Sequence, residues 1–90
     1  MRTAEDIRAL VYGILEGKFR TAGVPSPDRI GEEYDFFEAG IVDSLGFVEL
    51  MARLEQELGV ELDLSGIPND RLTRFHSFCE AVQAQVREQH

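Results

Sequence analysis

The stretch Gly40-Ile41-Val42-Asp43-Ser44-Leu45-Gly46-Phe47-Val48-Glu49-Leu50 carries the strongest local structural signal in this chain of 90 residues. A glycine-containing loop ends there, and apolar residues then recur at helical spacing as far as Leu58. Asp43 is a favourable N-cap, because its carboxylate can accept a hydrogen bond from an unpaired backbone N–H of the first turn. We therefore expect a helix from Ser44 to about Leu58, with the Ser44 hydroxyl at the positive end of the helix dipole.

The predicted helix has two apolar faces of different size. At about 100° per residue, five residues form a core face of normal width: Phe47, Leu50, Met51, Leu54 and Leu58. On the opposite side lie Leu45, Val48 and Ala52, beside Glu49 and Glu55. A small exposed apolar patch rimmed by acids favours a docking surface for partner proteins.

The first part of the chain predicts another amphipathic helix. Thr3 is a candidate N-cap, the apolar stripe begins at Ile7, and we expect the helix to end near Phe19. Prolines at 25 and 27 keep it from continuing. Residues 21–42 should form a long loop that packs on the bundle through its apolar second half, with Asp35 capping a turn that runs to Ala39.

Two further helices are expected after residue 59, where Gly59 can serve as the C-cap of the long helix. Asn69 is a candidate cap for a short helix from Asp70 to about Phe75. Ser77-Phe78-Cys79-Glu80 has the form of a capping box for a last helix that reaches about Arg87. The sequence therefore predicts an all-α fold, a four-helix bundle with three longer helices, one short helix and a long packed loop between the first two.

Length and composition restrict the possible classes of function. Ninety residues correspond to one domain, residues 1–90, with a modest core and no room for a deep cleft. No apolar run approaches the roughly 18 residues that span a membrane, and the N-terminus lacks the apolar run of a secretion signal. We expect a cytoplasmic monomer. Cys79 is the single cysteine, so no internal disulfide can form, and we expect its side chain to be buried.

The net charge of −8 is concentrated around Ser44. Residues 28–63 hold eleven acids and two bases, a net −9, whereas the other residues hold six acids and seven bases, a net +1. Such a field repels nucleic acid and anionic membranes and attracts basic protein surfaces. We therefore expect protein partners, with no nucleic acid and no membrane among them.

Catalytic and metal sites are not indicated. Ser44 has no histidine in its local motif and no Gly-x-Ser-x-Gly context, so nothing would activate it as a nucleophile. Glu61, Asp63 and Ser65 alternate as in a calcium loop, but Leu72 stands where a bidentate glutamate is required. His76 lies at a helix junction, where a structural role is expected. We expect no enzyme activity, no catalytic residue and no metal.

The residues around Ser44 resemble the modification site of acyl carrier proteins, in which an Asp-Ser-Leu triplet opens the second helix. The resemblance runs from about Ile7 to Val82 and includes Phe36-Phe37-Glu38-Ala39-Gly40 before the triplet and Val48-Glu49-Leu50 after it. It implies that Ser44 carries a covalent 4′-phosphopantetheine arm, with Asp43 and Leu45 completing the attachment site. The thiol of that arm would hold an acyl or aminoacyl cargo as a thioester.

The same resemblance implies several partners. They are a phosphopantetheinyl transferase, a ligase or transferase that loads the cargo, and downstream acyl-processing enzymes with basic docking surfaces. The residues expected to meet these partners are those of the exposed helix face: Leu45, Val48, Glu49, Ala52 and Glu55.

Departures from the family pattern bear on the subtype. Ile41 and Val42 stand where peptidyl carrier domains have a Gly-Gly-His/Asp-Ser type of motif. The chain looks more like a fatty-acid or polyketide carrier, or like a stand-alone carrier loaded by an adenylating ligase, such as D-alanyl carrier proteins. Gly46 and Phe47 replace polar residues common in housekeeping fatty-acid carriers, which favours a specialised pathway.

The alternative hypothesis is a helical adaptor that is never modified and binds basic partners through its acidic face. It shares the fold and the charge of a carrier. It leaves unexplained why Ser44 begins a helix beside an exposed Leu45.

Overall fold

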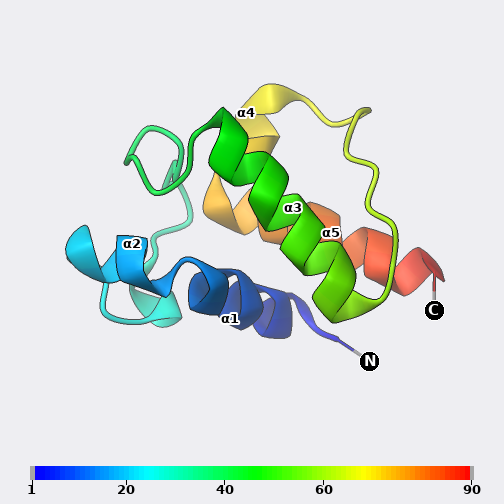
Figure 1. Cartoon of the computed structure of the whole chain (residues 1–90), viewed down its shortest axis with the longest axis horizontal. Coiled ribbons are helices and arrows are strands. Elements are labelled where there is room, and N and C mark those ends of the chain that lie inside the picture. The colour runs from blue at the N-terminus through cyan, green and yellow to red at the C-terminus, as the bar shows by residue number, and fades with distance from the viewer. Residues whose placement is uncertain (1, 90) are drawn as a thin grey trace.

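A computed structural model describes residues 2–89, which form five α-helices, one 3₁₀ helix and no strand. The long helices are α1 (Ala4–Ile14), α3 (Ser44–Leu58) and α5 (Phe75–Gln89). The short ones are α2 (Glu16–Thr21), α4 (Asn69–Leu72) and the 3₁₀ helix η1 (Pro27–Arg29). Helix α1 packs against α3 and α5, and α4 packs against α5 (Figure 1). The predicted all-α bundle is confirmed, and the bounds of α3 agree with the prediction.

The first helix begins as predicted but is interrupted. Thr3 and Asp6 form a reciprocal capping box at its start. The prediction of one helix to Phe19 is wrong, because the chain leaves helical geometry at Leu15 and resumes as α2. The bend lies between Gly13 and Gly17, two residues of low helix propensity.

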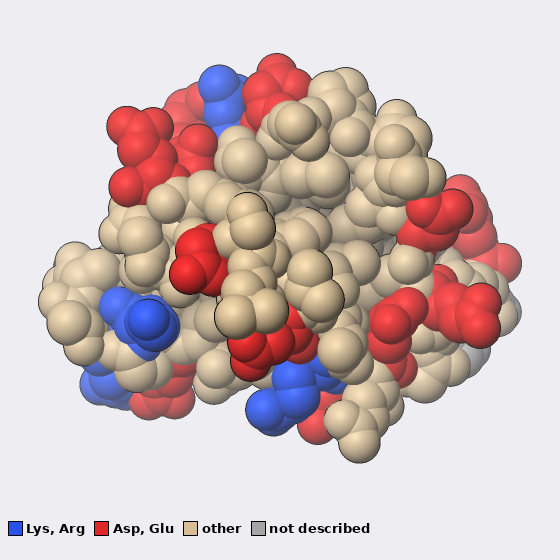
Figure 2. All heavy atoms as spheres, turned by 45° about the horizontal axis from the view of Figure 1, so that its top comes forward, with Lys and Arg blue, Asp and Glu red and all other residues tan. Residues whose placement is uncertain are grey.

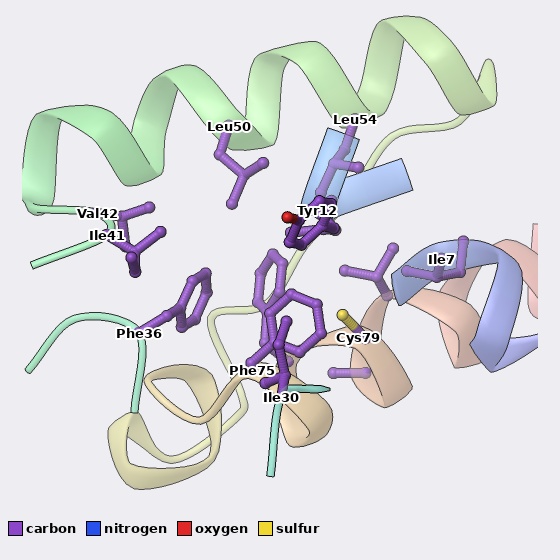
Figure 3. Close-up of a cluster of buried hydrophobic side chains, with 14 of the residues drawn as sticks. Ile7, Tyr12, Ile30, Phe36, Ile41, Val42, Leu50, Leu54, Phe75 and Cys79 are labelled. Atoms are coloured by element: carbon purple, nitrogen blue, oxygen red, sulfur yellow. The ribbon is translucent and has the colours of Figure 1, made fainter. Parts of the chain in front are cut away.

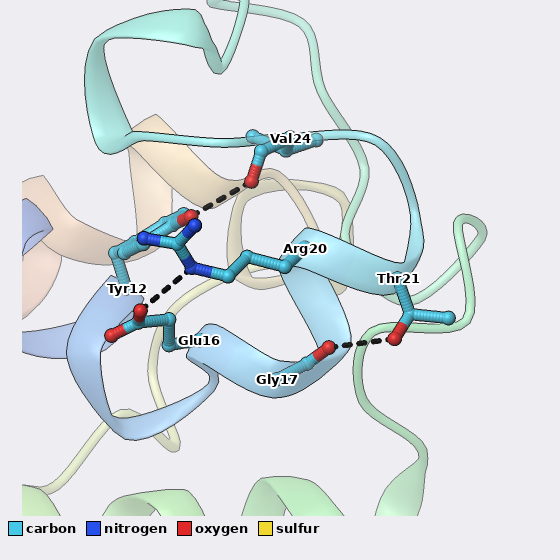
Figure 4. A network of polar contacts seen from close by, with 6 residues as sticks. All are labelled: Tyr12, Glu16, Gly17, Arg20, Thr21 and Val24. Atoms are coloured by element: carbon cyan, nitrogen blue, oxygen red, sulfur yellow. Dashed lines mark hydrogen bonds and ion pairs between the residues drawn. The ribbon is translucent and has the colours of Figure 1, made fainter.

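The bend turns Phe19 into the core. Its ring is fully buried and stacks on Tyr12 with the centroids 5.0 Å apart. The Tyr12 hydroxyl donates a 2.7 Å hydrogen bond to the carbonyl of Val24, which ties the following loop to α1 (Figure 4). The free energy gained by burying the Phe19 and Tyr12 rings therefore exceeds the cost of interrupting one straight helix.

The loop from residue 22 to 43 packs on the bundle, as predicted. The Asp35 carboxylate accepts the N–H groups of Phe37 and Glu38, and Gly40 leaves the turn with φ of 78°. The Phe36 N–H donates to the Thr73 carbonyl at 3.0 Å, so the loop is bonded to the segment between α4 and α5. The sequence analysis did not foresee η1 within this loop.

The predicted starts of the last two helices are wrong. Asn69 is the first residue of α4 rather than its cap, Pro68 precedes it, and α4 ends at Leu72 instead of Phe75. Helix α5 begins at Phe75, so Ser77 lies inside it and forms no capping box. The Phe75 ring is fully buried, and its N–H donates to the Tyr34 carbonyl at 2.9 Å. This tertiary contact starts the helix earlier than the local sequence indicates.

The core is one cluster to which α1, α3, α5 and the long loop all contribute (Figure 3). Leu50, Leu54 and Leu58 of the predicted core face are buried, and Phe47 and Met51 are half-buried at its edge. Cys79 is fully buried, and this burial raises the pKa of its thiol. One ring nitrogen of His76, Nε2, lies 2.9 Å from the Ile30 carbonyl oxygen, a structural contact.

Candidate functional site

The start of α3 is set by Asp43. The residue has extended backbone geometry, and its Oδ1 accepts the Gly46 N–H at 2.7 Å, which confirms the predicted N-cap. A Cβ at position 46 would lie only 3.1 Å from that same Oδ1. Gly46 therefore leaves room for the capping carboxylate, which gives a physical reason for a glycine near the start of a helix.

Ser44 is exposed and is the first residue of α3. Within residues 2–89, the N–H groups of Ser44 and Leu45 donate to no protein acceptor, whereas those of Gly46 and Phe47 are taken by Asp43. Two unpaired N–H groups at the positive end of a helix suit an anion such as a phosphate. The helix start therefore fits a phosphodiester on the Ser44 oxygen.

The outer face of α3 is exposed as the helical wheel predicts. Leu45 is 69% exposed and Val48 is 65% exposed, and Glu49 and Ala52 are exposed beside them. Acidic side chains lie around a largely uncharged area on the face shown in Figure 2, and basic side chains are fewer there. The first turns of α3 thus combine an apolar patch with negative charge next to Ser44.

Glu55 has a different role from the one predicted. It is half-buried, and its Oε2 accepts the Leu62 N–H at 2.8 Å, so it holds the loop after α3 rather than standing free for a partner. The candidate docking face therefore narrows to Leu45, Val48, Glu49 and Ala52.

Two glutamines of α5 hold the same loop from its other edge. Gln85 accepts the Asp63 N–H at 2.8 Å and donates to the Asp63 carbonyl. The Gln89 side chain likewise accepts the Glu61 N–H at 3.2 Å and donates to the Glu61 carbonyl. In an extended segment, the backbone groups of successive residues point to opposite edges. The N–H of Leu62, which lies between Glu61 and Asp63, therefore points away from α5 and donates to Glu55.

A groove of about 1060 Å³ opens beside the start of α3. Its walls come from the end of α1 and α2 on one side and from α3 on the other, and the loop before Ser44 completes it. The residues that line it include both neighbours of Ser44, Asp43 and Leu45, together with Lys18 and Arg53. The sequence analysis missed this groove, because one wall comes from residues 14–21 and the other from residues 45–53, far apart in the chain.

Comparison with known proteins assigns the family. Residues 20–69 match the family model described as "Phosphopantetheine attachment site". Over 77 residues, the chain is 32% identical to a D-alanyl carrier protein of Streptococcus sanguinis (strain SK36). The aligned region covers 86% of this chain and 91% of that protein. No solved structure shows a significant match. The chain belongs to the phosphopantetheine-binding carrier proteins.

Family membership settles the general role. The protein is a carrier with a covalently attached 4′-phosphopantetheine, and carriers of this kind are not enzymes but hold acyl groups for partner transferases and ligases. The expectation drawn from the Asp-Ser-Leu triplet is confirmed at this level. In the part of the chain that the structure describes, no helix has both the length and the apolar character of a membrane span.

Proposed function

We propose that Ser44 carries the phosphopantetheine arm and that the exposed face of α3 presents it to partner enzymes. One observation carries the proposal: Ser44 is exposed at a capped helix start, where the amides of Ser44 and Leu45 are unpaired. Ser44 also lies within the residues that match the attachment-site family. A serine in this position is fixed by a rigid helix yet open to a modifying enzyme.

The proposed modification uses coenzyme A as donor and a phosphopantetheinyl transferase as catalyst. A bond forms between the Ser44 Oγ and the phosphorus of the phosphopantetheine unit, and the bond from that phosphorus to adenosine 3′,5′-bisphosphate breaks. The hydroxyl proton leaves to a base of the transferase, since the Asp43 carboxylate beside Ser44 is engaged in capping α3. The carrier supplies the exposed oxygen and the two N–H groups that favour the resulting phosphodiester.

Partner docking is proposed for the surface formed by Leu45, Val48, Glu49 and Ala52. Leu45 and Val48 provide apolar contact area, and Glu49 provides a charge that a basic partner surface would complement. This proposed surface excludes Glu55. It is therefore smaller than the surface predicted from the sequence, and its centre lies nearer to Ser44.

Two observations favour a small cargo, with an aminoacyl group as the first candidate. One is the similarity to a D-alanyl carrier protein. The other is the packing of Phe47, whose ring centroid lies 5.3 Å from that of Phe37 and 5.4 Å from that of Phe78. The contact between Phe47 of α3 and Phe78 of α5 occupies space that a long acyl chain would need to enter between these helices. We therefore propose loading by an adenylating ligase over service in bulk fatty-acid synthesis.

Intact mass spectrometry tests the proposal. The unmodified protein is incubated with coenzyme A and several phosphopantetheinyl transferases of broad specificity, and the mass should rise by one phosphopantetheine unit. Ser44→Ala, shown by circular dichroism to be folded, should gain nothing. A Ser44→Ala protein that still gains the unit would contradict attachment at this residue.

Cargo class is tested on the modified protein. It is offered D-alanine with ATP and an adenylating ligase, and separately a long-chain fatty acid with an acyl–carrier ligase. Thioester formation with D-alanine alone is the expected result. Loading by the fatty acid alone would contradict the small-cargo proposal without affecting the role of Ser44.

A further inference from the structure

The groove beside Ser44 is distinct from the docking face proposed above, since it lies on the side of α3 that faces α2. It lies between α2 and the first half of α3, and the residues on both sides of Ser44 contribute to its lining. Its apolar lining includes half-buried Ile14 and Leu15 and the buried side chains of Ile41, Val42 and Leu50. A surface groove with an apolar floor beside the proposed attachment residue is placed to receive what that residue carries.

Polar groups along the groove match an amide-containing chain. Lys18 of α2 and Arg53 of α3 are exposed and take part in neither of the two ion pairs seen among residues 2–89. Both can donate to amide carbonyls, and Glu49 on the α3 wall can accept from amide N–H groups. The α2 wall is kept in shape by the Thr21 hydroxyl, which donates to the Gly17 carbonyl at 2.9 Å (Figure 4).

The lining of the groove extends along α3 from the residues beside Ser44 to Arg53. Arg53 is nine residues further along α3, which corresponds to about 13 Å at the rise of an α-helix. A pantetheine arm has two amide groups, a hydroxyl, a pair of methyl groups and a terminal thiol. Its mixture of apolar and polar groups corresponds to the mixture of groups that line the groove.

The other side of α3 is less suited to the arm. There the ring of Phe47 packs against the fully buried ring of Phe78, with the centroids 5.4 Å apart. An arm on that side would have to displace aromatic rings from the core, whereas the groove is already open. The packing of α3 therefore directs the arm toward α2.

We infer that the phosphopantetheine arm of the undocked carrier lies in this groove, against Lys18 of α2 and Leu45, Glu49 and Arg53 of α3; this rests on the proposed attachment to Ser44. Leu45 belongs both to the rim of the groove and to the docking face.

Nuclear magnetic resonance of the full chain tests the inference. Unmodified and modified proteins are compared by amide and methyl spectra, after intact mass shows one added unit and Ser44→Ala shows none. The expected result is a shift of the Gly17, Lys18 and Arg53 amides, with Overhauser contacts between the methyl groups of the arm and those of Leu15 or Leu45.

A pair of glycine variants gives a matched control. Gly17 and Gly13 are both exposed helical glycines with nothing within 4 Å of an added Cβ, but only Gly17 lines the groove. Gly17→Phe should abolish the shifts at Lys18 and Arg53 and speed alkylation of the arm thiol. Gly13→Phe should leave both at the wild-type level. Each variant is first shown to be folded and to accept the arm.

The outcomes separate the two proposals. A mass that does not rise contradicts attachment at Ser44. A mass that rises, with shifts confined to residues 43–46, means that the arm stays in solvent, and shifts centred on Phe47 and Phe78 mean that it lies on the other side of α3. Either result overturns the groove inference while leaving the attachment proposal intact.

Discussion

Asp43 and Ser44 are neighbours with separate tasks. The Asp43 carboxylate accepts the Gly46 N–H and starts α3, whereas Ser44 is exposed. Asp43→Ala should therefore lower the free energy of unfolding by about 1 kcal/mol, the usual cost of a lost N-cap. Ser44→Ala should leave stability nearly unchanged and abolish modification. Urea denaturation of the two variants and the wild type checks this, and an equal loss of stability at both positions would contradict the division of tasks.

Cys79 is the only thiol of the unmodified chain, and it is fully buried. Burial raises the pKa of this thiol, so the reactive thiolate is scarce at neutral or mildly alkaline pH. We expect native unmodified protein to resist iodoacetamide at pH 8, the urea-unfolded protein to take one label, and the native modified protein to take one label on its arm. Peptide mapping locates each label. Rapid labelling of Cys79 in the native state would contradict its burial.

At the scale of elements, α3 has a buried face and a free face. Leu54 is fully buried and Leu50 is 1% exposed, whereas Leu45 is 69% exposed. Leu54→Ala should cost about 2–5 kcal/mol of unfolding free energy, as buried leucines usually do. Leu45→Ala should cost much less, because most of the Leu45 side chain is exposed and its truncation removes little buried apolar area. Equal destabilisation at 45 and 54, measured by denaturant unfolding, would mean that α3 is rotated from the orientation described here.

Helix α5 holds the loop after α3 by two glutamine side chains. Gln85→Ala and Gln89→Ala remove the bonds to Asp63 and Glu61, respectively, and each should cost about 1 kcal/mol, the typical net value of a hydrogen bond. Amide hydrogen exchange should speed up at 61 and 63 in the double variant. The exposed Gln56→Ala is the control. Unchanged exchange at both amides would show that other contacts hold this loop.

At the scale of the whole molecule, the net charge of −8 affects how partners approach. Long-range charge mainly speeds encounter and is screened over about 8–10 Å at near-physiological salt, whereas apolar contact slows separation. The rate of Ser44 modification should therefore fall as salt rises. Glu49→Lys should lower the rate further and flatten its salt dependence, and Leu45→Ala should lower the rate at every salt concentration. Initial rates for the three folded proteins against ionic strength check this, and rates indifferent to salt and to both substitutions would exclude the α3 face as the docking surface.

The properties of α3 could be predicted from sequence because they depend on local interactions. Its start at Ser44, its cap at Asp43, its end at Gly59 and its buried and exposed faces follow from hydrogen bonds within a few residues and from helical periodicity. The proposed attachment site can be identified from the sequence for the same reason, since the Asp-Ser-Leu triplet that defines it is contiguous in the chain.

Other features depend on contacts between residues far apart in the chain. The bend at Leu15 comes with the stacking of Phe19 on Tyr12 and its edge contact with Phe75, and α5 begins at Phe75 because that ring is buried beside the loop. Glu55 is exposed on a helical wheel but is occupied by the Leu62 amide once the loop folds back. The groove beside Ser44 exists only because the fold places α2 and the loop before Ser44 alongside α3. Packing energy from such long-range contacts exceeds the local preferences of one or two residues, so helix bounds and shared surfaces are set by the assembled fold.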